Sequence, residues 1–441
     1  MSAALQKLEV SNVRRFKPYP AYKPSGVEWL GDVPAHWEVK QLKWAIMFQR
    51  GHDLPADERT EGDIPVVTSS GRSATHSVAV AKGPGIVTGR YGTIGEFYLI
   101  EEDYWPLNTT LYGVDLRGNE PRFLRYMLTN LSPLFLLNAI KSAVPGVDRN
   151  DIHPVKTVIP SPREQRCIAD FLDREMMKID TLIARKKALI ERLMEKRSTL
   201  ISRTVTRGLP LEAELAAGLD PYPQMKPSGM DWLGGVPAHW KEMMLKRTWA
   251  ACEYGLSDAL TGDGPIKVLT MGNIQEGQVH MPENGALEEV EENMLLKDGD
   301  LLFNRTNSLA HVGKVGMCRG MGYEQVTFAS YLVRIRANHY ALPAFLNFLL
   351  NTTQLLAFLR CLALPSINQA NLNPTRYGQI QVFLPPVKEQ QAIVNFLDQE
   401  TANINDMVRK VDAAMGCLQE YRTALITSAV TGKIDVRGAA A

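Results

Sequence analysis

The sequence predicts an α+β fold in which two tandem α/β domains are separated by two long antiparallel coiled-coil helices, with an approximate two-fold axis. Three observations support this prediction. A long run with helical periodicity occurs twice, a segment rich in Pro, Gly and Trp occurs twice ahead of it, and a stretch of mixed strands and one helix lies between them in each half. Internal repeats of this kind indicate a chain assembled from similar structural units.

Length and composition allow two domains. The chain has 441 residues, of which 45% are hydrophobic, and this is enough for two cores beside long exposed helices. The 49 basic and 48 acidic residues nearly cancel, so composition lacks the footprint of a strongly basic nucleic-acid binder. The five cysteines are scattered without a C-x-x-C pair, which argues against a disulfide framework or a zinc site and favours a reducing cytoplasm. We find no signal peptide and no run of about 18 apolar residues, so neither export nor membrane insertion is expected.

The first repeated element is a lead-in segment, residues 19–43 and again 222–246, that contains W-L-G-x-V-P-x-H-W. A histidine precedes a tryptophan near the middle of each copy, as His36-Trp37 and His239-Trp240. These histidines could be catalytic, but a Pro/Gly/Trp-rich segment repeated with few changes is more typical of packing. We therefore expect each lead-in to dock its domain onto a long helix.

Each lead-in is followed by a stretch of domain size with short strands and Gly-rich turns. In the first stretch we expect strands in 64–71, 85–100 and 108–116 and a helix near 123–137. In the second we expect strands in 266–273, 299–318 and 328–336 and a helix near 343–359. A polar loop closes each stretch, and we match loop 146–154 to loop 366–374. The element order agrees while the residues differ, which is expected of a protein that recognises two different things with one frame.

The second repeated element is the helical run from Ser161 to about Thr206, which recurs from Pro386 with a displacement of 225 residues and no gap. Ser161 is a good N-cap, Pro162 suits the first helical position, and Glu164 completes a capping box. Seven-residue spacing gives a coiled-coil seam with a second row four residues later. The two rows consist of Leu172, Ile179, Lys186, Leu193 and Leu200 with Met176, Ile183, Ile190 and Arg197 in the first copy, and of Leu397, Ile404, Val411, Leu418 and Leu425 with Thr401, Val408, Met415 and Arg422 in the second.

The order of elements predicts the direction of these rods. The second domain leaves the C-terminal end of the first rod and leads into the N-terminal end of the second, and the termini of a domain usually lie close together. The rods should therefore be antiparallel, each roughly 65 Å long for about 44 residues. They would carry the domains at opposite ends and act as a ruler between them.

The first rod is basic, and two interpretations of this charge stay open. It is either a solvated helix face or a surface that follows phosphates. The basic residues are Arg185, Lys186, Lys187, Arg192, Lys196, Arg197, Arg203 and Arg207.

Several of these motifs resemble one family. They are the two P-x-x-x-E-Q-x-x-I-x-x-F-L-D helix starts (Pro160–Asp173 and Pro385–Asp398), the G-D-L-L-F-N-R and V-G-K-V-G turns of the second domain, and the two lead-ins. Together they resemble the specificity subunit of a type I restriction-modification system, over nearly the whole chain from Tyr19 to about Asp435. The first domain departs from the pattern, with GRYGTIG where the second has NRTNSLAHVGKVG.

The resemblance implies a non-catalytic DNA-recognition subunit of a system that defends against foreign DNA. Each globular part would be a target recognition domain for one half of a bipartite, asymmetric double-stranded DNA target, and the rods would set the spacer and dock the modification subunits. The implied partners are two methyltransferase subunits with S-adenosylmethionine and restriction subunits that use ATP and magnesium. No cofactor or metal is expected in this chain itself, no membrane is involved, and the implied location is the cytoplasm.

Motifs for nucleotide and methyl-donor chemistry are missing from the sequence. No G-x-x-x-x-G-K-[ST] occurs, since Gly313-Lys314 is followed by Val and Gly432-Lys433 by Ile. No Asn/Asp-Pro-Pro-aromatic run of an amino-methyltransferase is present, and the eight histidines show no metal-ligand spacing. We therefore expect this chemistry to come from other chains.

Direct readout of DNA needs side chains such as Arg, Asn and Gln on loops that reach base edges. The candidates in the first domain are Thr68, Ser69, Ser70, Arg72, Arg90, Tyr91, Thr93, Asn108, Thr109, Arg149 and Asn150. The candidates in the second domain are Asn273, Gln275, Arg305, Thr306, Asn307, Ser308, Lys314, Ser330, Tyr331, Asn368, Gln369 and Asn371. Each has an alternative interpretation as a turn or capping residue. Arg90 and Arg305 share a frame position and could be structural for that reason, whereas the variable polar loops are better candidates for base contacts.

These elements give the predicted boundaries. They are 1–160 for the first recognition domain with its lead-in 19–43, 161–208 for the first rod, 209–385 for the second recognition domain with its lead-in 222–246, 386–435 for the second rod, and 436–441 for a tail. Two other hypotheses stay open. A coiled-coil scaffold joining two protein-binding domains would explain the rods but gives the polar loops no role, and a nuclease acting alone requires a metal-binding carboxylate cluster that the sequence does not show.

Overall fold

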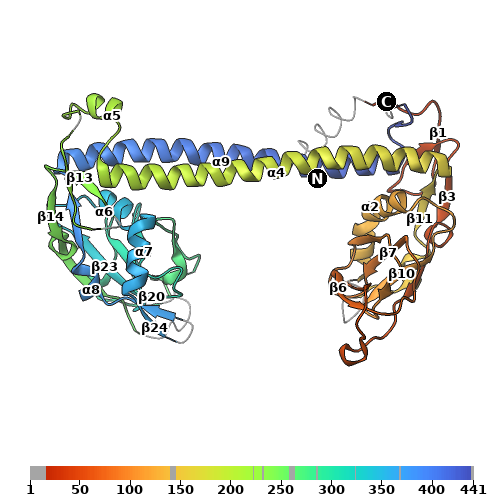
Figure 1. Ribbon diagram of the computed structural model, residues 1–441, viewed down its shortest axis with the longest axis horizontal. Helices are drawn as coiled ribbons and strands as arrows, with labels where there is room; N and C mark the ends of the chain where they lie inside the picture. The colour runs from red at the N-terminus through yellow and green to blue at the C-terminus, as the bar shows by residue number, and fades with distance from the viewer. Residues whose placement is uncertain are drawn as a thin grey trace. The chain divides into compact units, whose positions relative to one another are not determined.

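The computed structural model describes residues 16–139, 146–221, 223–230, 233–257, 264–284, 287–322, 324–366 and 369–438. Its elements are labelled in Figure 1. The chain divides into two compact units: unit 1 is Met1–Lys187 with Val411–Ala441, and unit 2 is Ala188–Lys410. Trp232 of the second lead-in and the candidate Asn368 lie outside the described residues.

Unit 1 combines short strands with one covering helix. Its elements are β1 (Tyr22–Pro24), β2 (Asp32–Pro34), β3 (Glu38–Gln41), η1 (Leu42–Trp44), β4 (Met47–Arg50), η2 (Ala56–Glu58), β5 (Ile64–Thr68), β6 (Gly71–His76), β7 (Gly85–Gly89), β8 (Phe97–Ile100), β9 (Trp105–Pro106), β10 (Thr110–Asp115), α2 (Pro121–Ala139), α3 (Arg149–Ile152), β11 (Lys156–Ile159) and the start of α4 (Pro162–Arg207). An antiparallel sheet of order β4-β10-β7-β8 is covered by α2, which packs on β7 and β8 (Figure 1). Beside it, β5 pairs with β6 and runs parallel to β9. Trp37 of the lead-in, Phe123 of α2 and Leu172 of α4 belong to the same core.

Unit 2 repeats this plan and extends it. Its elements are α5 (Leu211–Ala216), β12 (Met225–Pro227), β13 (Gly235–Pro237), β14 (Lys241–Met244), η3 (Leu245–Thr248), β15 (Trp249–Tyr254), β16 (Lys267–Leu269), η4 (Met271–Asn273), β17 (Ile274–Gln275), β18 (Gln278–Val279), η5 (Glu292–Met294), β19 (Leu301–Asn304), β20 (Thr306–Asn307), β21 (Val315–Met317), β22 (Val326–Phe328), β23 (Leu332–Ala337), α6 (Pro343–Leu350), α7 (Thr353–Leu362), β24 (Leu364–Ser366), β25 (Gln369–Asn371), α8 (Pro374–Gly378), β26 (Gln381–Leu384) and the start of α9 (Val387–Val430). The order β15-β23-β19-β21 matches β4-β10-β7-β8, and β18 and β17 lengthen this sheet. The pair β16 and β22 is parallel, as are β5 and β9.

The two predicted rods are present as single helices, α4 and α9. All residues of the predicted seam and second row are buried or half-buried. In unit 1, Asp180 of α4 pairs with Arg422 of α9 at 3.0 Å, while Glu164 lies 4.0 Å from Arg437 beyond the end of α9. From the first contact to the second, the residue number falls in α4 and rises toward the end of α9. These segments are therefore antiparallel, as predicted. In unit 1 the start of α4 shares a core with the end of α9, and in unit 2 the end of α4 shares a core with the start of α9.

The repeated glutamate of the rod motif holds the lead-in. Glu164 accepts a hydrogen bond from His36 Nε2 at 3.1 Å, and Glu389 accepts from His239 Nε2 at 2.8 Å. Both carboxylates are buried at the starts of their helices. These contacts confirm the packing role predicted for the two histidines. Of the predicted capping box, the bond from the Glu164 N–H to Ser161 Oγ is present at 3.4 Å, while the Glu164 carboxylate serves His36.

The repeated glutamine of the same motif joins each rod to the helix of its domain. The Gln165 amide donates to Asn119 Oδ1 at 2.7 Å and accepts from the Glu120 N–H at 2.8 Å, just before α2. Gln390 accepts from the Leu342 N–H at 2.8 Å, just before α6. The Glu-Gln pair that recurs in the two halves of the chain therefore fastens the lead-in, the domain helix and the rod together.

One predicted helix is wrong. The single helix expected near 343–359 is broken into α6 and α7, which meet at 71°. At the break, the Asn351 side chain accepts from the Val315 N–H at 3.1 Å and donates to Val315 O at 2.8 Å, so it ties the turn to β21. Within the described ranges no single helix is long and apolar enough to cross a bilayer, and only the bent pair α6 and α7 reaches that length and hydropathy when taken together.

Candidate nucleic-acid interface

Arg90 and Arg305 occupy the same place in the two units. Each directly follows a central strand of the shared four-stranded sheet, β7 in unit 1 and β19 in unit 2. The Arg90 N–H donates to Thr109 O at 2.8 Å, and the Arg305 N–H donates to Tyr331 O at 3.1 Å. Their carbonyls accept from Val147 and Leu372, at 3.0 and 2.9 Å. The frame equivalence inferred from the sequence therefore holds at the level of backbone hydrogen bonds.

The same hydrogen bonds correct our alignment of the polar loops. Val147 corresponds to Leu372, and the helix N-caps Asp148 and Asn373 then coincide, because each accepts from the backbone N–H two residues later. The loops are related by 225 residues (148 to 373), whereas we had matched 146–154 to 366–374. The error is five residues, and it arises because unit 2 carries the hairpin β24–β25 directly before this point.

In unit 2 the structure brings several candidates together around Arg305. Arg305 Nη1 donates to Ser330 O at 3.2 Å, and its guanidinium lies 5.1 Å from the ring centre of Tyr254. The candidate Tyr331 is exposed beside this pair. Because strand β20 pairs with β25, Asn371 Nδ2 reaches Thr306 Oγ1 at 3.0 Å. These contacts bring together Arg305, Thr306, Asn307, Ser330, Tyr331, Gln369 and Asn371, of which Thr306 is buried and the others are exposed or half-buried.

The remaining candidates of unit 2 make other contacts. Asn273 Oδ1 accepts from the Thr270 N–H at 2.8 Å, which is a capping role, and Gln275 donates to Gly272 O at 3.4 Å in the same turn. Lys314 Nζ lies 3.1 Å from His311 Nδ1. Ser308 is exposed at the end of β20, where its N–H donates to Asn307 Oδ1 at 2.7 Å.

In unit 1 the candidates around Arg90 also form one surface. The Arg90 guanidinium lies 4.9 Å from the ring centre of Tyr91, which is exposed. Thr93 donates its hydroxyl to Ser69 O, and this joins the β7–β8 turn to the β5–β6 turn that holds Thr68 and Ser70. Thr109 Oγ1 is buried without a hydrogen-bond partner among the described residues.

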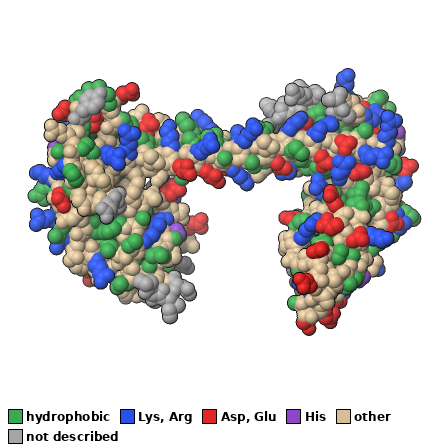
Figure 2. All heavy atoms as spheres, viewed as in Figure 1, with side chains coloured by type: hydrophobic (Ala, Val, Ile, Leu, Met, Phe, Trp, Pro, Cys, Tyr) green, Lys and Arg blue, Asp and Glu red, His purple; other side chains and the backbone are tan. Residues whose placement is uncertain are grey.

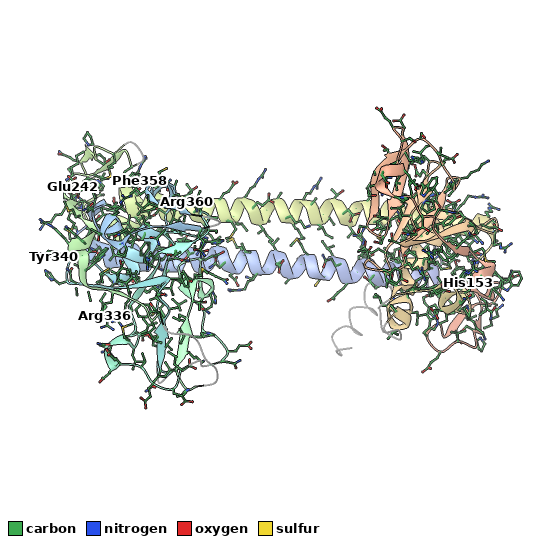
Figure 3. The ribbon with its side chains drawn as sticks, turned by 90° about the horizontal axis from the view of Figure 1, so that it is seen from below. His153, Glu242, Arg336, Tyr340, Phe358 and Arg360 are labelled. Atoms are coloured by element: carbon green, nitrogen blue, oxygen red, sulfur yellow. The ribbon has the colours of Figure 1, made fainter. Side chains whose placement is uncertain are left out.

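A polar pocket of about 450 Å³ opens at the end of β4 in unit 1. Its polar lining consists of Gln49, Arg50, His52, Asp53, Asp148 and Arg149. The candidate Asn108 donates to Asp53 at its edge, and Asn150 lies in the α3 turn capped by Asp148. His153, labelled in Figure 3, accepts from the Phe48 N–H at 3.0 Å and so fixes α3 against β4. Burial and the nearby Arg149 charge lower the pKa of His153, which favours the neutral acceptor form.

Sequence reasoning missed two residues of these surfaces, Arg50 in unit 1 and Tyr254 in unit 2. Both are exposed at the ends of edge strands, β4 and β15, and lie far in sequence from the loops we selected. A usable signal was present, because each is followed by a glycine, Gly51 or Gly255, at nearly the spacing of the repeated lead-ins.

Charge is mixed over both units. In the view of Figure 2, acidic and basic side chains are interspersed and neither unit presents a broad basic face. The candidate Arg72 pairs with Glu102, in a turn with exposed carboxylates at Glu101 and Asp103. Such a turn repels phosphates, so Arg72 is poorly placed to contact a nucleic-acid backbone. Within the described residues no group of three or more His, Cys, Asp or Glu could hold a metal ion.

Comparison with known proteins identifies the family. A family model described as type I restriction modification DNA specificity domain matches residues 34–192 and 251–411, together more than half of the chain. The EcoKI specificity subunit of Escherichia coli (strain K12) is 25% identical over 313 residues, covering 68% of this chain and 63% of that subunit. The StySPI specificity subunit of Salmonella potsdam is 23% identical, covering 69% and 64%. The matched region thus spans less than two thirds of the length of these relatives.

Solved structures share the fold. One, from work on complex assembly and conformational transition of the type I R-M system, aligns with a TM-score of 0.61 at 14% identity and covers 90% of this chain and 98% of its own. The HsdS subunit from Thermoanaerobacter tengcongensis aligns with a TM-score of 0.50 at 16% identity and covers 91% and 98%. The regions matched by the family model include both rod starts, 160–173 and 385–398, and the chain belongs to the type I restriction-modification DNA specificity family.

Proposed function

We propose that this chain is the DNA-recognition subunit of a type I restriction-modification complex, in which each unit reads one half of a bipartite, asymmetric target. One observation carries the proposal. Two units with the same frame present an arginine at the same position, Arg90 or Arg305, surrounded by different exposed polar and aromatic side chains. Arginine, Asn and Gln on such surfaces are the groups that read base edges, and different sets read different sequences.

The chemistry of the complex belongs to other subunits in this proposal. The chain is non-catalytic, and it works in the cytoplasm with two methyltransferase subunits that carry S-adenosylmethionine and with restriction subunits that use ATP and magnesium. The family membership supports this division of labour, and so does the absence of nucleotide and methyl-donor motifs from the sequence. Methyl transfer by the purified chain alone would contradict it.

The rods act as the ruler between the half-sites in this proposal. Inserting four residues between Leu200 and Val205 adds about 6 Å of helix, which corresponds to at most about two base-pair steps of roughly 3.4 Å. Four residues turn the helix slightly more than once and nearly restore the seam. The insertion should keep both half-sites and lengthen the unread spacer by one or two base pairs. A two-residue insertion at the same place rotates the seam and should lower stability and activity together.

The test is selection from a random duplex library by the chain assembled with its methyltransferase partner, at two salt concentrations. We expect enrichment of two unlike half-sites at a fixed spacing, with affinity that falls as salt rises because phosphate contacts release counterions. A perfectly palindromic target would contradict divergent readers. A complex without sequence preference would instead favour the scaffold hypothesis.

A further inference from the structure

Strand register shows that Arg50 and Tyr254 are equivalent positions. Arg50 on β4 pairs with Leu111, and Tyr254 on β15 pairs with Val333. Leu111 in turn pairs with Thr88 on β7, and Val333 pairs with Phe303 on β19. Thr88 lies two residues before Arg90, and Phe303 lies two residues before Arg305. We call Arg90 and Arg305 the frame arginines. Both sheets therefore place an exposed side chain at the end of the edge strand, two strands away from that arginine.

The next residue in each unit confirms the equivalence. A Cβ on Gly51 would lie 2.1 Å from Leu107 O, and a Cβ on Gly255 would lie 2.3 Å from Ala329 O. Both glycines thus let the edge strand pass directly over the backbone that leads into the central strand. This close passage fixes where the preceding side chain, Arg50 or Tyr254, projects.

In unit 2 two contacts hold this position. Glu253, the residue before Tyr254, accepts from Nε of the fully buried Arg334 at 2.9 Å. The Arg305 guanidinium lies against the Tyr254 ring, and 52% of Tyr254 remains exposed. An arginine stacked on an aromatic ring keeps the edge of its guanidinium accessible, and in Arg305 the Nη1 donor at that edge bonds Ser330 O while no hydrogen bond from Nη2 or Nε is formed among the described residues. Tyr254 therefore orients Arg305 and presents a ring face beside it.

In unit 1 the same position projects an arginine into open polar space. Arg50 lines the 450 Å³ pocket at the end of β4 together with Gln49 and Arg149. Arg50 and Gln49 are exposed. The lining also contains Asp53, which accepts a hydrogen bond from Asn108, and Asp148, which caps α3. The lining thus offers guanidinium donors and carboxylate acceptors, the two kinds of group that match the major-groove edge of a G·C pair, where guanine offers two acceptors and cytosine offers an amino donor.

We infer that the strand-end positions Arg50 and Tyr254 are matched specificity determinants. Arg50 reads a guanine of the first half-site through two hydrogen bonds, and Tyr254 sets the reading of one base by Arg305 in the second. The inference rests on the proposed function and adds residues and a base class to it. Because the two positions carry different chemistries on one frame, they account for part of the asymmetry of the target.

The test uses the chain assembled with its methyltransferase partner, and base preference is measured by random-duplex selection. Arg50→Lys keeps the positive charge but loses the planar fork, so we expect a loss of about 5- to 150-fold in preference at one base pair of the first half-site. The second half-site should not change. Lys82→Ala is the control, because it removes an exposed charge from unit 1 outside the pocket and should leave every base preference unchanged.

Tyr254 supplies the reciprocal test. Tyr254→Phe keeps the ring under Arg305 and should retain the second half-site, whereas Tyr254→Ala should weaken the preference at one base of that half-site only. Unchanged preferences in both Arg50→Lys and Tyr254→Ala, with a bipartite target for the unmodified chain, would overturn this inference and leave the proposed function intact. An unmodified chain without sequence preference would overturn the proposed function and this inference together.

Discussion

Units 1 and 2 agree in their frame and differ at their recognition surfaces. Both use a His–Glu contact to dock a lead-in, a glutamine to fasten the domain helix, and four strands in the same order. Unit 2 adds β17–β18 at one edge of its sheet and β24–β25 before its rod, and it has Tyr254 where unit 1 has Arg50. These differences show that the recognition surface can change while the frame stays the same. The contacts that hold the frame together, those of Glu164, Gln165, Glu389 and Gln390, lie at the starts of the rods and not at the recognition surface.

The frame itself contains one difference. Trp240 Nε1 donates to Glu389 at 2.9 Å, while Trp37 Nε1 is buried and has no hydrogen-bond partner among the described residues. Both indoles are almost fully buried. The two equivalent tryptophans should therefore contribute differently to the free energy of unfolding. Matched substitutions in the two units can measure this difference.

The largest effect is expected from removing either indole. Trp37→Ala and Trp240→Ala each leave a large cavity between lead-in and rod and should lower the free energy of unfolding by about 3–5 kcal/mol. Urea denaturation followed by circular dichroism measures the change. A loss below about 1 kcal/mol at either site would show that the lead-in does not hold its unit together.

A smaller loss is expected at the glycines of the edge strands. Gly51→Ala and Gly255→Ala place a methyl group against a backbone carbonyl, and such overpacking costs about 1–3 kcal/mol. Gly416→Ala is the control, because nothing lies within 4 Å of its Cβ position in α9, and it should stabilise by about 1 kcal/mol. Tolerance of both edge substitutions would contradict the shared register of β4 and β15.

The two tryptophans should respond differently to phenylalanine. Trp240→Phe removes the hydrogen bond to the buried Glu389 and should cost about 1 kcal/mol more than Trp37→Phe, which removes an indole N–H that is already unpaired. The comparison of the two melting curves cancels most of the shared packing loss. Equal losses would mean that the Trp240–Glu389 bond adds nothing to stability.

The smallest effect is a pH dependence confined to unit 1. His153 has a lowered pKa in the folded chain and must be neutral to accept from the Phe48 N–H. Its contribution is therefore fully present above the ordinary value of 6.5 and is lost as pH falls below it through the folded pKa. Stability measured from pH 7.5 to 5.5 should fall more in the unmodified chain than in His153→Gln. Unit 2 has Gly378 at the equivalent position and lacks this titration.

The rods and lead-ins could be predicted from the sequence because their residues recur at fixed spacing. The seams of the two rods, Leu172 to Leu200 and Leu397 to Leu425, follow from that recurrence, and so does the packing role of His36 and His239. The structure confirms both predictions. The direction of the rods followed from the order of elements along the chain.

The recognition surfaces could be predicted only in part. Arg90 and Arg305 were found because they follow aligned strands, but the polar loops were misaligned by five residues, since the β24–β25 hairpin changes the spacing without leaving a repeat. The helix near 343–359 was drawn too long because its break depends on a contact between Asn351 and β21. Tyr254 meets Arg305, and Arg50 takes the matching place two strands from Arg90, only through strand pairing, which composition and local pattern do not report.

The central claim is that the frame is common and that the surface placed on it decides which sequence is read. Its most direct test is a chimera in which residues 43–155 replace residues 246–380. These ends match, because the Leu42 N–H donates to Val155 O and the Leu245 N–H donates to Ile380 O in the same way. Random-duplex selection with the methyltransferase partner then reports the target. The account predicts a symmetric target made of two inverted copies of the first half-site. A chimera that still selects the original asymmetric target would contradict it.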